Sequence, residues 1–419
     1  MAVGNNAAPL ASQKEAMVPI MPELMNLESL LWPRIKQNTK LTPVSTRPTR
    51  VATQPITGGK LRVFGADGQK MGRGSGPQEV YGYISCASYL QASEYTAQSQ
   101  YATDSSQKAI NNYVATTHEQ AFKTLGGYLD VFGKMDGSNT IDTIVSVAAG
   151  NMGTVVNNAN FFQSNQTVDV WSAVGGTFRG SVEIEVEDSS TQTLWYTTTV
   201  PTGTVAGDVL MVSGSSGQAN SGMFGILYYA TNLNVGNYLG IARAGYPGRY
   251  TAQGINLGGQ SLTPAAVRAI RIQIMNAMGI KVAKSVDAVA YCTPGMQQAW
   301  ENNSIPVQTI VRNEMRGDNS ADMLPKEMAS TIGGMEMMPS TRAIPGRIDM
   351  IPFSELSRVE TKPVDYYAVD GATEFAVIGD DGGLQSSNLF YVVLQANLLA
   401  ENLRLWSYLS NVAIPKYVT

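Results

Sequence analysis

The chain has 419 residues, of which 15% are charged and 43% hydrophobic, and its formal net charge is -4. This composition predicts a globular protein with a sizeable core and an uncharged polar surface, and it argues against an acidic disordered chain. The slight negative charge leaves no basic stripe that could follow nucleic-acid phosphates, so direct high-affinity binding of DNA or RNA is disfavoured.

The first hundred residues are predicted to be extended. Residues 1–39 form an N-terminal arm with a short amphipathic helix at 22–31, and residues 40–103 form an extended loop, a long β-hairpin. Because this loop has few large apolar side chains before Val80, it should lie across another surface. Its basic side chains suit contacts with a neighbouring subunit: Arg47, Arg50, Lys60, Arg62, Lys70 and Arg73.

The strongest helix signal begins at Asp104, whose carboxylate can accept first-turn N–H groups, with Gln107 as its capping-box partner. Apolar residues then recur at three- and four-residue spacing as far as Tyr128, and Gly133 supplies a stop. The pattern predicts a helix of roughly 27 residues that lies as a strut across a sheet. This helix is part of a predicted domain that spans residues 104–165.

The middle of the chain is predicted to be rich in strands. Residues 140–147 are strand-like, and the stretch from 167 to about 230 contains alternating β-branched runs near ten-residue spacing, which predict a small antiparallel barrel or sandwich. The last segment, 354–419, contains a long apolar stretch at 389–418. So much apolar surface near a terminus indicates packing against its own subunit or a neighbour.

A second helix is predicted after Thr263, an N-cap followed by Pro264 at the first helical position, and Gly279 closes it. Residues 286–292 then read as a buried strand, and further strands follow near 335–338 and 347–352. This succession predicts a compact α+β domain over 261–353.

The order of these elements, rather than any one motif, resembles the major capsid proteins of tailed bacteriophages, which have the Hong Kong 97-type fold. The closest local likenesses lie at 286–294, 332–338, 344–351 and 398–406. The resemblance implies an α+β fold with an N-terminal arm, an extended loop, a long spine helix, and peripheral and axial domains. Residues 166–260 are then a β-rich insertion, and 354–419 are strands that return to the peripheral domain.

The resemblance also implies a function. The subunit would self-assemble as pentamers and hexamers into an icosahedral phage head that encloses double-stranded DNA, with portal, scaffold or decoration proteins as partners. It would be a non-enzymatic virion protein, assembled in the host cytoplasm without cofactor or membrane. The expected intersubunit contacts are the basic loop residues Arg50, Lys60, Arg62, Lys70 and Arg73, with the acidic run at 374–381 as one candidate partner.

Some members of the family weld their subunits through a Lys to Asn isopeptide bond. Lys60 and Lys70 lie in the corresponding loop, but no motif identifies the asparagine or the assisting glutamate, so that chemistry is not transferred. Two separate cysteines, Cys86 and Cys292, support neither a disulfide framework nor a zinc ribbon. No stretch approaches the roughly 18 apolar residues of a membrane span.

Other patterns that carry chemistry are weak. The glycine-rich segment 72–77 lacks the lysine of a phosphate-binding loop. His118 is the only histidine, so we expect an ordinary helix residue rather than a metal ligand or catalytic base. Asp380 and Asp381 indicate a turn more than a cation site. A last pattern, predicted to be a solvated strand edge rather than glycosidase acids, comprises Glu183, Glu185 and Glu187.

Three alternatives to a phage head remain. An encapsulin-type compartment resembles the same fold but loads cargo enzymes. A tail or fibre protein that binds glycans would fit the β-rich middle, although the long helix and the α+β domain argue against it. A hydrolase that uses Asp or Glu has only scattered carboxylates to support it.

Overall fold

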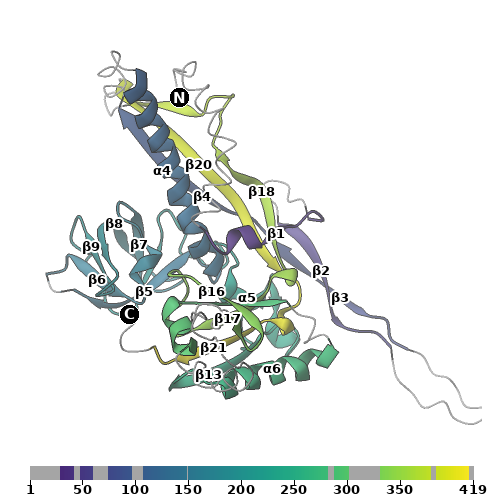
Figure 1. Cartoon of the computed structure of the whole chain (residues 1–419). Coiled ribbons are helices and arrows are strands. Elements are labelled where there is room, and N and C mark those ends of the chain that lie inside the picture. The colour runs from purple at the N-terminus through teal and green to yellow at the C-terminus, as the bar shows by residue number, and fades with distance from the viewer. Residues whose placement is uncertain are drawn as a thin grey trace, which may run out of the picture.

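The computed structural model consists of three packed bodies and a projecting hairpin (Figure 1). The bodies are a long five-stranded sheet crossed by a helix, a closed six-stranded barrel, and a six-stranded sheet with its own helix. One large apolar core joins the long sheet, its helix and the barrel, and a second lies in the six-stranded sheet. The structure describes residues 29–41, 48–59, 74–96, 107–148, 150–281, 287–301, 331–378 and 384–414.

The long sheet is built around β20 (Leu384–Ala400). β4 (Ala87–Thr96) pairs antiparallel along one side of β20, while β18 (Leu356–Tyr366) and β19 (Glu374–Ile378) follow each other along the opposite side. β1 (Lys36–Gln37) adds a short parallel strand beyond β18. This body therefore combines C-terminal strands with two pieces from the first hundred residues.

The helix α4 (Gln107–Lys134) lies across this sheet, where the sequence predicts a long helix (Figure 1). The Tyr89 ring on β4 stacks on the Phe132 ring of the helix, with centroids 3.9 Å apart. The expected N-cap lies outside the described residues. Gly133 does not stop the helix, which ends one residue later. The glycine is instead needed for packing, because a Cβ at this position would lie 2.6 Å from Leu31 Cδ2.

The buried carboxylate of Asp130 on α4 fixes the start of the described chain. Its oxygens accept hydrogen bonds from the N–H groups of Leu30 and Leu31, each at 3.0 Å, and from the Ser29 hydroxyl. The 3-10 helix η1 (Trp32–Arg34) follows at once. The Asp130 carboxylate and its three donors thus satisfy one another's hydrogen-bonding capacity, as buried polar atoms require.

The barrel closes in the order β10-β5-β6-β9-β8-β7. Its six strands are β5 (Thr140–Val147), β6 (Gly153–Val156), β7 (Thr167–Trp171), β8 (Phe178–Asp188), β9 (Thr193–Tyr196) and β10 (Val209–Val212). The β-rich module therefore begins before the expected boundary at 166, because closure needs β5 and β6 to pair the otherwise open edges of β10 and β9. It also ends well before 260, at β10.

The six-stranded sheet has the order β13-β21-β17-β14-β16-β15. The strands are β13 (Gln253–Gln260), β21 (Ser407–Val412), β17 (Ile348–Pro352), β14 (Ala288–Cys292), β16 (Met335–Pro339) and β15 (Thr331–Ile332). Its helix α6 (Pro264–Met278) has the predicted ends, since the Thr263 hydroxyl accepts from Ala266 N and Gly279 has φ 88°. β13 and β21 come from outside 261–353, so the C-terminal segment does not return wholly to the long sheet.

Candidate intersubunit surface

The strand pair β2 (Thr49–Ile56) and β3 (Gln78–Ile84) forms a hairpin that leaves the body on the side away from the barrel (Figure 1). The register places Arg50 opposite Tyr83 and Ala52 opposite Tyr81. A two-stranded ribbon by itself is only marginally stable in water. The projecting part is shorter than the predicted loop over 40–103, because the chain has joined the long sheet as β4 by Ala87.

Contacts at the root of the hairpin set the direction in which it leaves. The Tyr83 N–H donates to Leu239 O at 2.8 Å, and Thr53 Oγ1 lies 2.7 Å from the Tyr250 hydroxyl. Gly82 packs so closely that an added Cβ would lie 2.8 Å from Leu239 Cβ. The absence of a side chain at this position lets the main chain of β3 rest directly on the body.

The outer face of the hairpin carries exposed aromatic and basic side chains. The Arg50 guanidinium carbon lies 3.4 Å from the centroid of the Tyr81 ring, and Tyr81 and Tyr83 are 40% and 55% exposed. Stacking holds the guanidinium in place while its charge remains in water. Tyrosine and arginine are the side chains that most often anchor protein interfaces. We call Arg50, Tyr81 and Tyr83 the hairpin face.

Arg50 is the predicted contact residue for which the structure gives a position. Arg47, Lys60, Arg62, Lys70 and Arg73 lie outside the described residues. The two tyrosines of the hairpin face are not identified by the pattern of charges in the sequence. The signal that could have found them is the alternation at 79–83, where Glu79, Tyr81 and Tyr83 share one face of a strand.

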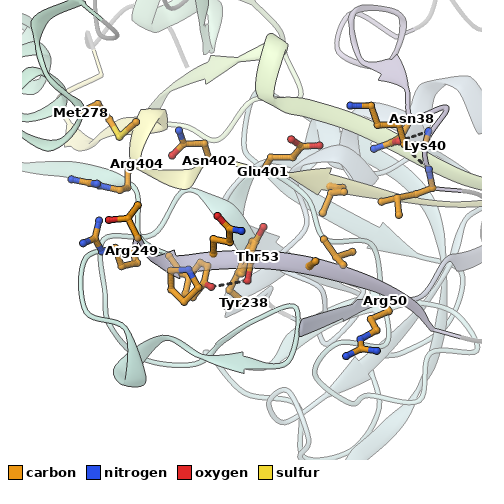
Figure 2. Close-up of a pocket in the computed structure, with 18 residues that line it drawn as sticks. Asn38, Lys40, Arg50, Thr53, Tyr238, Arg249, Met278, Glu401, Asn402 and Arg404 are labelled. Carbon is orange, nitrogen blue, oxygen red and sulfur yellow. Dashed lines mark hydrogen bonds between the residues drawn. The ribbon is translucent and has the colours of Figure 1, made fainter. Parts of the chain in front are cut away.

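A groove of about 690 Å³ lies between β2 and the body (Figure 2). Arg249 and Arg404 lie near one end and Lys40 near the other, with Glu401 as the acidic residue between them. Burial, and then the charge of Arg249, lower the pKa of Arg404, but an arginine stays charged throughout the physiological range. The groove thus has a positive field that favours an anionic group over a cationic one.

The acidic run expected to receive a neighbour's loop begins with a carboxylate that is used inside its own subunit. Tyr95 donates its hydroxyl hydrogen to Glu374 Oε2 at 2.7 Å, and the side chain of Glu374 is 11% exposed. Burial raises the pKa of Tyr95, so its hydroxyl keeps its proton. Glu374 is therefore not accessible to a neighbouring hairpin, and Asp380 and Asp381 lie outside the described residues.

His118 belongs to the same internal network. Its Nδ1 lies 2.8 Å from the Tyr366 hydroxyl, its Nε2 lies 3.8 Å from Glu374 Oε1, and its ring stacks on Phe390 with centroids 3.9 Å apart. Side chains from three strands, β18, β19 and β20, thus converge on one buried ring between α4 and the long sheet. The arrangement is that of a packed helix residue.

The described residues offer little for metal or redox chemistry. Among them, no group of three or more His, Cys, Asp or Glu side chains could hold a metal ion. Cys86 and Cys292 are free thiols, and burial raises the pKa of Cys292 to about 12, so it remains protonated and unreactive. None of the helices that the structure describes is both long and apolar enough to span a bilayer.

No family model matches this sequence, and no curated protein matches it. Solved capsids do match its structure. The capsid asymmetric unit of cyanophage A-1(L) is similar over 92% of this chain and 94% of that chain, with a TM-score of 0.52 and 11% identity. The capsid of the native GTA particle aligns over 91% of this chain and 89% of that chain, with a TM-score of 0.44 and 10% identity.

The capsid of Myoviridae phage XM1 aligns over 91% of both chains, again with a TM-score of 0.44 and 10% identity. The inference of fold rests on the cyanophage capsid, which has the highest TM-score of the three. At such low identity the likeness establishes fold and not activity. The chain therefore has the mixed α+β, strand-rich fold of a phage capsid subunit, and the resemblance predicted from the order of its elements is confirmed at that level.

Proposed function

We propose that this chain is the major capsid protein of a tailed phage, which self-assembles as pentamers and hexamers into an icosahedral head around double-stranded DNA. The observation that carries the proposal is the hairpin: on a chain with a capsid fold, a marginal two-stranded ribbon holds its Arg and Tyr side chains out into solvent. Such a segment gains stability when a second copy covers it.

The proposed division of labour follows the bodies of the fold. The long sheet with α4 serves as the peripheral domain and the helix as its spine, while the six-stranded sheet serves as the axial domain. The barrel is an insertion, and the hairpin is the described part of the extended loop. The role is structural and needs no cofactor. Portal, scaffold or decoration proteins are the proposed partners, and the virion is the proposed location.

The DNA is proposed to be enclosed rather than gripped. A net charge of -4 on each chain gives many copies a negative sum, which repels phosphates mildly at short range and is screened by salt at longer range. Packaged DNA then needs no release step that breaks specific contacts. The head interior acts as a container.

Electron microscopy and sedimentation of the purified full chain, with and without scaffold, test the proposal. Closed shells of uniform size are the expected result. A chain that stays monomeric under all these conditions would contradict the proposal. Shells that contain protein cargo instead of nuclease-protected DNA would move the assignment to a compartment with the same fold.

A matched pair of variants ties assembly to the hairpin face. Replacing Tyr81 and Tyr83 together by Ser should leave the subunit folded, because both side chains are exposed, and should strongly reduce shell formation. The control replaces Leu233 and Val235, which are 59% and 65% exposed and are not part of the hairpin, by Ser. Equal assembly by the two double variants would show that the hairpin face is not a contact.

A further inference from the structure

An exposed apolar patch lies on the outer surface of the barrel. Val186 on β8 is directly opposite Trp195 on β9, and Trp195 is directly opposite Gly153 on β6. Val186 and Trp195 are 49% and 41% exposed, and Met152, next to the glycine, is 39% exposed. A Cβ at Gly153 would lie 3.1 Å from Trp195 Cε3, so the indole rests on the glycine. We call Val186, Trp195 and Met152 the barrel patch.

The barrel patch is bordered by acidic side chains with no free base among them. Glu183 and Glu185 are exposed on β8, beside Val186. β6 and β9 carry no charged residues, and the one basic residue of β8, Arg179, pairs with Asp208 at 2.7 Å. The surface is therefore apolar and aromatic at its centre and negative at its border.

The barrel removes the simpler explanation of these acids. Carboxylates that alternate along a strand often keep a free sheet edge from pairing with other chains, and the sequence predicts that role for Glu183 and Glu185. β8, however, lies inside a closed barrel, where it pairs with β7 over residues 178–183 and with β9 over residues 184–188, so neither glutamate stands on the edge strand of an open sheet. Acids around an exposed tryptophan instead mark a surface that selects a basic partner.

The hairpin of a second copy has the complementary chemistry. Its outer face presents Arg50 stacked on Tyr81, with Tyr83 beside them and one acid, Glu79, which accepts from the Tyr81 hydroxyl at 3.3 Å. The chain between β2 and β3 adds only one acid, Asp67, to four further bases in the sequence, Lys60, Arg62, Lys70 and Arg73. Aromatic side chains can pack on Trp195 and Val186 while the charge of Arg50 faces the glutamates.

The arrangement of the subunit makes this contact possible only between copies. The hairpin leaves one side of the molecule and the barrel stands on the other, with the long sheet and α4 between them (Figure 1). A contact between two different surfaces of identical chains is head-to-tail, and such contacts close into rings when the rotation allows. Copies placed side by side would each offer a hairpin to one neighbour and a barrel to the next.

We propose that the barrel patch, with Glu183 and Glu185, is the docking site for the β2–β3 hairpin of a second copy of this chain. The proposal rests on the proposed shell function and names the surface that receives the hairpin. Of the acidic run at 374–381, Glu374 is not available for this role, because its carboxylate is buried in its own subunit.

Engineered disulfides test the proposal in assembled shells. In a Cys86→Ser background, Tyr81→Cys is combined with Val186→Cys, and the shells are oxidised mildly and run on a denaturing gel without reductant. Because each copy then carries one cysteine of each kind, we expect a ladder of linked chains that extends beyond dimers. Mixing the two single variants should give dimers only. The remaining thiol, Cys292, is buried and does not take part.

The control pairs Tyr81→Cys with Val205→Cys, which is 52% exposed but lies before β10, across the barrel from β9. It should give no ladder. A second test pair, Arg50→Cys with Glu185→Cys, repeats the experiment on the charged border if the first pair disturbs folding. Shells that form normally but give no ladder with either test pair would overturn the docking proposal and leave the shell function standing. Failure of the unmodified chain to form any shell would overturn both.

Discussion

Replacing Gly82 by Ala should loosen the hairpin from the body. In a strand this change alone would stabilise by roughly 0.5–1 kcal/mol, because alanine has less freedom to lose on folding. Here the new Cβ would lie 2.8 Å from Leu239 Cβ, about 1 Å inside normal contact. Leu239 cannot move away easily, since it is fully buried and its N–H donates to the Tyr228 hydroxyl at 2.8 Å.

Overpacking of this kind costs about 1–3 kcal/mol, and the neighbouring Tyr83 N–H bond to Leu239 O would be strained as well. The net loss should be about 1–2 kcal/mol, which corresponds to roughly 5- to 30-fold more frequent opening of the hairpin root. The melting temperature of the rest of the subunit should change little. Assembly should fall, because a hairpin that leaves in several directions meets its partner surface less often.

Amide hydrogen exchange over residues 49–56 and 78–84, read by mass spectrometry, measures the opening directly. The matched control is Gly76→Ala in the same hairpin, where a Cβ would meet nothing within 4 Å. If the Gly82 variant shows the same amide exchange and the same assembly as the control and the unmodified chain, the close approach to Leu239 does not set the direction of the hairpin.

Three further changes test other contacts. Asp130→Ala leaves the buried Leu31 N–H without its acceptor and should lower the free energy of unfolding by about 2–3 kcal/mol in urea titrations. Gly225→Ala places a Cβ 2.4 Å from a carbonyl oxygen of α4 and should cost about 3 kcal/mol in the same assay. Hydrogen bonds, of which that from the Ser190 hydroxyl has the largest effect, lower the pKa of Asp188 from 3.8 to about 2. The ionised carboxyl therefore stabilises the β8–β9 turn above pH 3.8, and the melting-temperature gap to Asp188→Ala should close as pH falls from 3.8 toward 2.

Some elements of the fold could be predicted because their causes are local. The ends of α6 follow from Thr263 as cap, Pro264 in the first turn and Gly279 in a conformation with positive φ, all within a few residues of the ends they define. The apolar periodicity of α4 acts over the same short range. The exposed charge of Arg50 could likewise be expected from a strand with few apolar partners.

Other features could not be predicted, because their causes lie far apart in the chain. Gly133 reads as a helix stop but is required by contact with Leu31, a hundred residues earlier. The run from Glu374 reads as an accessible acidic surface, yet Tyr95 and His118 from two other elements enclose its first carboxylate. In each case the residue type is compatible with two roles, and the distant contact selects one.

The sequence by itself determined an α+β chain, the position of its two longest described helices, and a hairpin with too few apolar side chains to form a core of its own. The tertiary structure decided which strands pair: it closed the barrel with β5 and β6, placed β21 beside β13 and β17, and brought Trp195 and Val186 together outside the barrel. The physical reason is the distance along the chain over which each interaction acts. Caps and periodicity act over a turn or two of backbone, whereas strand partners and surface patches depend on the free energy of burying residues that the sequence keeps far apart.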